Sequence, residues 1–151
     1  MTVVGRRFMR CLMVDTLDPL SRSKVMARVK GTNTGPELLV RKIVFAAGYR
    51  YRLHVRDLPC SPDLTFIHKR KVIFVHGCFW HSHEGCDAAR IPKSRIEFWR
   101  TKLNGTKLRD ARTVEALLHA GWDVMVVWEC ELRDPEKVAK SIQIFLDGPH
   151  S

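Results

Sequence analysis

The chain has 151 residues, of which 45% are hydrophobic and 28% charged, a mixture typical of one folded domain and not of a disordered polypeptide. Its formal net charge of +10 makes a polyanion, usually a nucleic acid, the first partner to consider. The apolar run at residues 11–14 is too short for a signal peptide, and no run of about 18 apolar residues suggests a membrane span. We therefore expect a soluble cytoplasmic protein whose five cysteines are thiols or metal ligands, not a disulfide framework.

Two helices are predicted in the first third of the chain. The stretch SRSKVMARV at residues 21–29 predicts a short helix behind a basic arm, and charge alone leaves open whether that arm contacts DNA or is simply solvated. Thr34 and Glu37 have the spacing of a capping box, and Gly48 can end a helix in a left-handed conformation. Apolar residues at helical spacing between them predict an amphipathic helix of about three turns.

Four segments predict β-strands. The stretch YRYRLHV at 49–55 alternates like a half-buried strand, and LTFI at 64–67 and KVIFVHG at 71–77 flank a charged turn, which predicts a hairpin. The stretch WDVMVVWEC at 122–130 is almost continuously apolar, as expected for a central strand covered on both faces.

Two further helices are predicted, one over residues 96–120 that is weakened in its middle by an Asn-Gly pair, and a closing one over 134–148. The order helix, three strands, helix, strand, helix predicts an α/β fold with a mixed sheet flanked by helices. We expect a single domain over residues 21–147, preceded by a basic extension at 1–20.

One loop gathers metal-ligand residue types. Cys78, His83 and Cys86 have the spacing C-x4-H-x2-C, and Cys130 lies at the end of the last predicted strand. Two thiolates and an imidazole in one loop, joined by a distant thiolate, supply the four ligands of a closed structural zinc site. Ordinary buried cysteines beside a surface histidine are the alternative, and three such residues within nine positions favour zinc.

Catalytic candidates surround this loop. Asp63 begins a predicted strand, where a carboxylate can hold Mg²⁺ for phosphodiester hydrolysis, although an aspartate after proline is more often a turn residue. The hairpin would return Val75 and His76 beside Asp63. His76 and His81 remain outside the zinc ligands and are candidate catalysts, or else ordinary packed histidines.

Three aromatic residues, Phe79, Trp80 and Trp99, complete the pattern. Bulky apolar side chains on a basic surface can wedge between base steps and unstack them. Core packing is the commoner fate of such residues, but a loop of histidines and cysteines is a poor place for a deep core.

The combined pattern resembles the very-short-patch repair (Vsr) DNA mismatch endonucleases. The resemblance extends over roughly residues 20–146 and rests on motifs in the same order and with compatible gaps: RSKVMARV, PE at the first helix, SPDLTF, FVHGCFWHSHEGC, RIEFW and VVWECEL. It implies a restriction-endonuclease-like core and Mg²⁺-dependent nicking on the 5′ side of the T in a T:G mismatch, the lesion left when 5-methylcytosine deaminates.

The resemblance also implies roles for single residues. Asp63 and the backbone carbonyl of Val75 would bind Mg²⁺, although the family pattern has Thr where Val75 stands. His81 would be the general base or would orient the attacking water, and His76 would hold water or phosphate at the metal. Glu37 and Asp110 would be supporting acids. The zinc ligands would be Cys78, His83, Cys86 and Cys130. The wedge beside the mismatch would consist of Phe79, Trp80 and Trp99.

Two other functions stay open at this point. A related nuclease could cut matched or otherwise modified DNA, and a non-catalytic, zinc-stabilised DNA-binding module would explain the charge, cysteines and aromatics but not Asp63 and the two extra histidines. The resemblance implies a bacterial, nucleoid-associated monomer that acts on double-stranded DNA, with a cytosine methyltransferase and mismatch-repair factors as partners and no membrane.

Overall fold

A small mixed sheet organises the part of the chain that the computed structural model describes, residues 32–149. Its strands are β1 (Leu64–Phe66), β2 (Lys71–His76) and β3 (Asp123–Trp128), in the spatial order β1-β2-β3. β1 pairs antiparallel with β2 in the predicted hairpin, and β3 pairs parallel with β2. The parallel pair brings the ends of β2 and β3, and the loops that follow them, to the same edge of the sheet.

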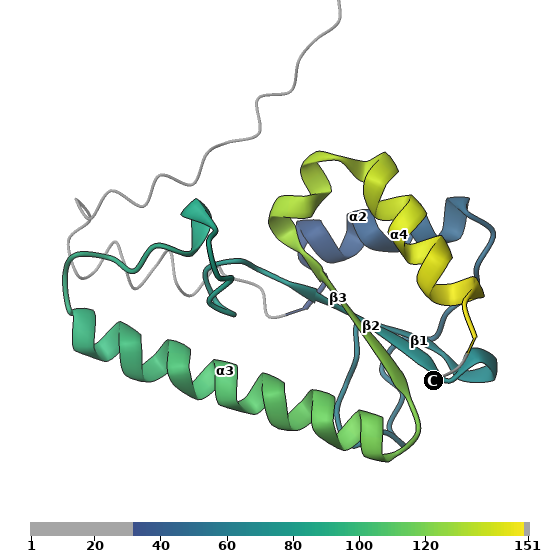
Figure 1. The fold of residues 1–151 in the computed structure, drawn as a ribbon, viewed down its shortest axis with the longest axis horizontal. Helices are drawn as coiled ribbons and strands as arrows, with labels where there is room; N and C mark the ends of the chain where they lie inside the picture. The colour runs from purple at the N-terminus through teal and green to yellow at the C-terminus, as the bar shows by residue number, and fades with distance from the viewer. Residues whose placement is uncertain (1–31, 150–151) are drawn as a thin grey trace, which may run out of the picture.

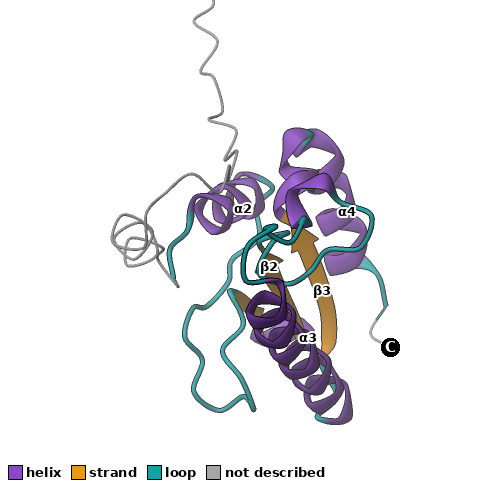
Figure 2. Cartoon of the chain, turned by 90° about the vertical axis from the view of Figure 1, so that its left-hand side faces the viewer, coloured by secondary structure: helices purple, strands orange, loops and turns teal. Residues whose placement is uncertain are grey.

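Within residues 32–149, three α-helices cover the two faces of this sheet (Figure 1). α2 (Gly35–Ala46) and α4 (Pro135–Asp147) lie side by side on one face, and α3 (Ile96–His119) lies on the other. A second view, turned by 90°, shows the same three layers (Figure 2). The predicted α/β class with a mixed sheet flanked by helices is therefore confirmed.

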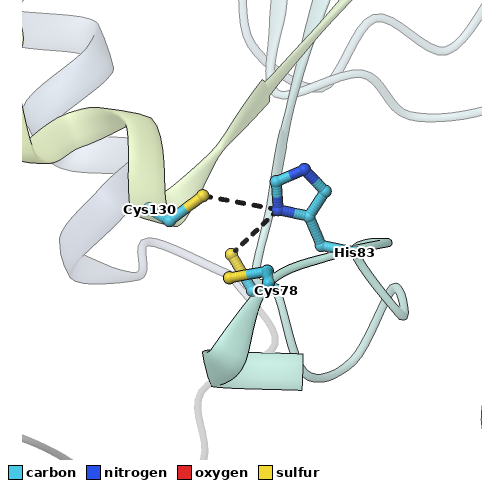
Figure 3. Close-up of side chains that lie close together, drawn as sticks. Cys78, His83 and Cys130 are labelled. Atoms are coloured by element: carbon cyan, nitrogen blue, oxygen red, sulfur yellow. Dashed lines mark hydrogen bonds between the residues drawn. The ribbon is translucent and has the colours of Figure 1, made fainter. Parts of the chain in front are cut away.

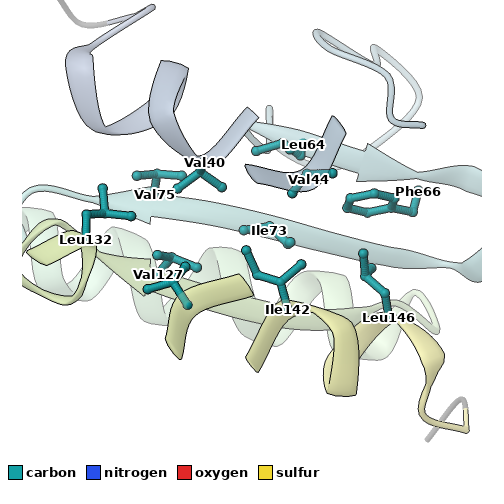
Figure 4. Close-up of a cluster of buried hydrophobic side chains, with 11 residues drawn as sticks. Val40, Val44, Leu64, Phe66, Ile73, Val75, Val127, Leu132, Ile142 and Leu146 are labelled. Atoms are coloured by element: carbon teal, nitrogen blue, oxygen red, sulfur yellow. The ribbon is translucent and has the colours of Figure 1, made fainter. Parts of the chain in front are cut away.

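The core lies between the sheet and the α2–α4 layer (Figure 4). Burial of each large aliphatic side chain there stabilises the fold by roughly 1.5–3 kcal/mol. The buried cluster consists of Val40, Val44, Leu64, Phe66, Ile73, Val75, Val127, Leu132, Val138, Ile142 and Leu146.

The predicted helix ends are confirmed, with one difference in detail. The Thr34 side chain accepts from the Glu37 N–H at the start of α2, and Gly48 adopts a left-handed φ of 91° just after the helix. The Glu37 carboxylate accepts from the Thr34 hydroxyl and from the N–H of Asn33, one residue before the cap. Asp134 caps α4 by accepting from the Lys137 N–H.

Two strand predictions are wrong. The segment 49–55 is not a strand: Arg52 and Thr65 form an isolated bridge, and His54 turns the chain at a left-handed φ of 53°. Within the described residues β3 is an edge strand, and β2 is the central one. The apolar run at 122–130 correctly indicated a strand with helices on both faces. A strand covered on both faces can still lack a neighbouring strand on one side.

Smaller differences concern the ends and the middle of elements. α3 runs through the Asn-Gly pair as one helix of 24 residues. Short 3₁₀ helices continue from the strands or interrupt the loop, namely η1 (Ile67–Lys69), η2 (Asp87–Ala89) and η3 (Glu129–Arg133). The helix predicted at 21–29 and the extension at 1–20 lie outside the described residues. Among residues 32–149, no helix combines the length and apolar character needed to cross a membrane.

Candidate functional site

Four side chains of metal-ligand type meet where β2 and β3 end. We call them the Cys–His cluster: Cys78, His83, Cys86 and Cys130. Each offers one donor atom, and these four atoms lie within 4.8 Å of one another. His83 Nδ1 lies 3.6 Å from Cys78 Sγ and 3.3 Å from Cys130 Sγ (Figure 3). Cys130 comes from η3, and the other three come from the loop after β2. The parallel strand pair is thus what brings Cys130 to the loop.

The spacing and chemistry of this cluster fit a bound metal ion. Zn–S bonds of about 2.3 Å and Zn–N bonds of about 2.0 Å place tetrahedral donors roughly 3.5–3.8 Å apart. Burial raises the pKa of the Cys78 and Cys130 thiols, so metal binding there must displace protons. The Cys–His cluster could therefore hold a metal ion in exchange for those protons.

The loop of the Cys–His cluster is held in shape by its own backbone. The N–H of His83 donates to the carbonyl of Cys78 at 2.9 Å, and the N–H of Cys86 donates to the carbonyl of His83 at 3.3 Å. Ser82 and Gly85 adopt left-handed φ angles of 51° and 71°, which fold the loop back on itself. These turns let residues close in sequence point at one centre.

Asp63 directly precedes β1, and its side chain reaches the neighbouring strand β2. Its Oδ2 accepts the Val75 N–H at 2.7 Å. The N–H and C=O of one strand residue point to the same side, so the Val75 carbonyl also faces Asp63. Burial raises the pKa of Asp63 from 3.8 to about 6, against the opposing effect of the Val75 N–H. A desolvated carboxylate beside a carbonyl oxygen suits a hard cation such as Mg²⁺.

Glu37 and Arg41, one turn apart on α2, flank Asp63 electrostatically. Glu37 raises the pKa of Asp63 and Arg41 lowers it, after the larger effect of burial. The buried Glu37 carboxylate lies 3.3 Å from the Arg41 guanidinium, which also donates to Asn33 Oδ1 at 2.6 Å. Glu37 thus caps α2 and also acts on the pKa of Asp63.

His76 and His81, here called the histidine pair, stack face to face with ring centroids 3.8 Å apart and an interplanar angle of 9°. His81 Nδ1 lies 2.6 Å from Asp110 Oδ2 on α3. A carboxylate that accepts the Nδ1 proton leaves Nε2 of the neutral ring as an acceptor, the arrangement of an oriented general base. Donor atoms of the histidine pair and Asp110 lie within 4.8 Å of one another, and Asp63 is not part of that group.

His76 is the more enclosed member of the histidine pair. Burial, with a further contribution from His81, lowers the pKa of His76 from 6.5 to about 4, while Asp110 acts in the opposite direction. His76 is therefore neutral at physiological pH. A neutral imidazole can hold water or a phosphate oxygen by hydrogen bonding.

Four aromatic residues, Phe79, Trp80, Phe98 and Trp99, form a second ring cluster, here called the aromatic cluster, and Trp80 directly precedes His81 in the sequence. Phe79 contacts Trp80 and Trp99 with ring centroids 5.1 and 5.4 Å apart, and Phe98 contacts Trp99 at 5.3 Å. Trp99 is only 7% exposed, whereas Phe98 is 47% exposed. The three predicted wedge residues therefore lie together, and Trp99 is packed beneath the other rings. Phe98 adds an exposed ring that was not predicted.

Three further residues belong to this region and were missed. Arg41 follows Glu37 by four positions, a spacing that signals an ion pair. Lys102 places its ammonium 5.4 Å from the Trp80 ring centroid and 5.8 Å from those of Phe98 and Trp99. Trp128 contacts rings of both the histidine pair and the Cys–His cluster. No spacing rule could have identified Trp128, because its neighbours come from another strand and a loop.

Comparison with known proteins adds a family to this geometry. The family model described as DNA mismatch endonuclease Vsr matches residues 14–87. Type II nicking enzyme V.XorIIP of Xanthomonas oryzae pv. oryzae is 45% identical over 135 residues, which cover 89% of this chain and 98% of the relative.

Two more relatives have similar coverage. Type II nicking enzyme V.NmeAIP of Neisseria meningitidis is 39% identical over 122 residues, or 81% of this chain and 86% of the relative. DNA mismatch endonuclease Vsr of Escherichia coli is 38% identical over 126 residues, or 83% of this chain and 80% of the relative. The chain is thus a hydrolytic, DNA-nicking endonuclease that belongs to the Vsr family of DNA mismatch endonucleases.

Proposed function

We propose that this enzyme nicks one strand of duplex DNA on the 5′ side of the T in a T:G mismatch and needs Mg²⁺ to do so. The observation that carries the proposal is that the end of β2 joins a half-buried carboxylate, bound to the Val75 N–H, with an oriented histidine stacked on His76. One relative is named a mismatch endonuclease and others are named nicking enzymes. The choice of T:G among mismatches comes from the motif resemblance.

The metal would be held by Asp63 and the Val75 carbonyl. When bound, Mg²⁺ supplies charge stabilisation at the phosphodiester and a more acidic water. Glu37, which lies close enough to act on the pKa of Asp63, adds negative charge that favours a cation there. Arg41 limits the repulsion between the two carboxylates in the absence of the ion.

The histidine pair would handle the proton. His81, oriented by Asp110 at 2.6 Å, accepts a proton from the attacking water at Nε2, and the carboxylate stabilises the imidazolium that forms. His76, neutral and stacked on His81, holds the water or a phosphate oxygen in place. Both histidines act from fixed positions, because one is on β2 and the other is tied to α3.

The aromatic cluster would recognise the mismatch by inserting between base steps. A T:G wobble pair is less well stacked than a matched pair, so unstacking it costs less. Phe79 and Trp80 come immediately before His81 in the loop after β2, so a wedge there would place the backbone of a neighbouring nucleotide near the histidine pair. The Cys–His cluster, which we propose holds Zn²⁺, would keep this loop rigid.

Cleavage of end-labelled duplexes that differ only in T:G versus T:A tests the proposal. The wild-type enzyme should give a single nick 5′ to the mismatched T with Mg²⁺ and none without it. Asp63→Ala should abolish nicking while mismatch binding persists. Equal cleavage of both duplexes would instead support a nuclease for matched DNA, and binding without cleavage would contradict a catalytic role for this site.

A further inference from the structure

Trp128 connects the Cys–His cluster to the histidine pair through ring contacts. Its ring stacks on His83 with centroids 4.0 Å apart and an interplanar angle of 5°. It also meets the His76 ring at 5.3 Å and 79°, an edge-to-face contact. His76 in turn stacks on His81, so four rings run in contact from the cluster toward Asp110.

The strand register explains why these rings meet. His76 and Trp128 are paired residues at the ends of β2 and β3. Paired residues of adjacent strands project their side chains to the same face of the sheet, next to each other. Each strand end also carries a cluster cysteine two residues later, Cys78 after His76 and Cys130 after Trp128. The same register therefore aligns both the rings and the thiols.

Both ends of this ring series are fixed by directional contacts. At one end the His83 Nδ1 faces the sulfurs of Cys78 and Cys130, so a bound metal fixes the plane of the His83 ring. At the other end His81 is held by Asp110. Among the described residues, Trp128 is the ring that contacts both His83 and His76.

We propose that Trp128 is a positioning residue that transfers the orientation of the metal-bound His83 ring to His76, so that the Cys–His cluster supports catalysis directly and not only folding. This inference rests on the proposed function of the histidine pair. The interaction energy of one aromatic pair corresponds to a factor of about ten in rate at most. Loss of the Trp128 contacts should therefore slow nicking by about ten-fold, without a matching loss of DNA binding.

Three variants of the full-length, zinc-loaded protein separate positioning from folding. Trp128→Leu removes the ring, and Trp128→Phe keeps a smaller one. His83→Cys removes the imidazole from Trp128 but leaves four thiolates, a ligand set that also forms closed zinc sites. Zinc content, affinity for a T:G duplex and the single-turnover nicking rate would be measured for each, and ¹H–¹⁵N spectra of the imidazoles would report on His76 without any need for activity.

We expect Trp128→Leu and His83→Cys to retain one zinc and wild-type DNA affinity, to nick about ten-fold more slowly, and to change the His76 ring signals. Trp128→Phe should restore most of the rate. The double variant should be no slower than either single variant, because both remove the same series of contacts.

Two results would overturn the inference. One is a double variant whose rate loss is the product of the two single losses. The other is an unchanged set of His76 signals in Trp128→Leu. If His83→Cys binds no zinc, the Trp128→Leu and Trp128→Phe pair decides the question alone. A wild-type enzyme that nicks no T:G duplex would refute the proposed function instead, and the imidazole spectra would still test the coupling.

Discussion

Replacement of Asp63 by Asn should make the enzyme inactive and, without Mg²⁺, more stable. The carboxylate is half-buried, and its desolvation, with a smaller effect of Glu37, raises the pKa of Asp63 from 3.8 to about 6. Because the folded pKa exceeds the unfolded one, stability that is fully present below pH 3.8 is lost as the pH rises through about 6. Asn carries no charge, and its carbonyl can still accept the Val75 N–H.

The size of the effect follows from the same shift. A difference of about two pH units corresponds to about 3 kcal/mol once Asp63 is fully ionised, near pH 8. About half of that is already lost at pH 5, where the unfolded chain is ionised and the folded protein is not. Asp63→Asn should therefore be about 3 kcal/mol more stable than wild type at pH 8, and the gap should narrow by about 1 kcal/mol or more at pH 5.

Urea denaturation of zinc-loaded protein at several pH values, without added Mg²⁺, measures this gap. Asp57→Asn is the matched control, since Asp57 is an exposed carboxylate in the loop before β1 and its replacement should change stability by less than about 0.5 kcal/mol. Added Mg²⁺ should stabilise wild type alone, because it binds the folded carboxylate. A variant no more stable than wild type at pH 8, or a gap that does not change with pH, would refute this account of Asp63.

Three further outcomes are expected. Asp110→Asn should slow nicking by roughly 10²–10⁴-fold with little change in DNA affinity, because an amide can hold His81 in the wrong tautomer. A normal single-turnover rate in this variant would show that Asp110 does not orient His81 for catalysis. Cys86→Ala should lose bound zinc in a metal-content assay and unfold at lower urea, whereas Cys60→Ala, outside the Cys–His cluster, should retain the metal; equal zinc content in both variants would contradict the ligand set. Trp80→Ala should weaken binding to a T:G duplex by about 1–3 kcal/mol and binding to a matched duplex by less; equal losses on both duplexes would argue against a wedge.

The elements that the sequence predicted well depend on short-range chemistry. The ends of α2 were readable because Thr34 and Gly48 act within one turn of the helix. The hairpin of β1 and β2 was readable from two apolar runs around a charged turn. The segment 49–55 misled because its tyrosines do pack against the core, yet the bend at His54 and a single bridge to Thr65 leave no room for a ladder.

The candidate site shows the same division. The spacing of Cys78, His83 and Cys86 by itself predicted a metal site, because one loop can place three ligands around one ion. Cys130 was added because its residue type and strand position fitted, and the parallel register of β2 and β3 is what brings it there. The contact of His81 with Asp110 spans 29 positions and was not predicted, although the family resemblance had named Asp110 as a supporting acid.

The sequence by itself therefore determined the class of fold, the ligand chemistry of the loop and the residues available for catalysis, because these depend on residue type, periodicity and spacing. Tertiary structure alone decided that β3 lies at an edge, that Trp99 is packed beneath the other rings, and that Trp128 belongs to the site. Those features depend on which surfaces of segments far apart in the sequence pack against one another. Strand register and helix packing set that sharing, and no local pattern in the chain encodes it.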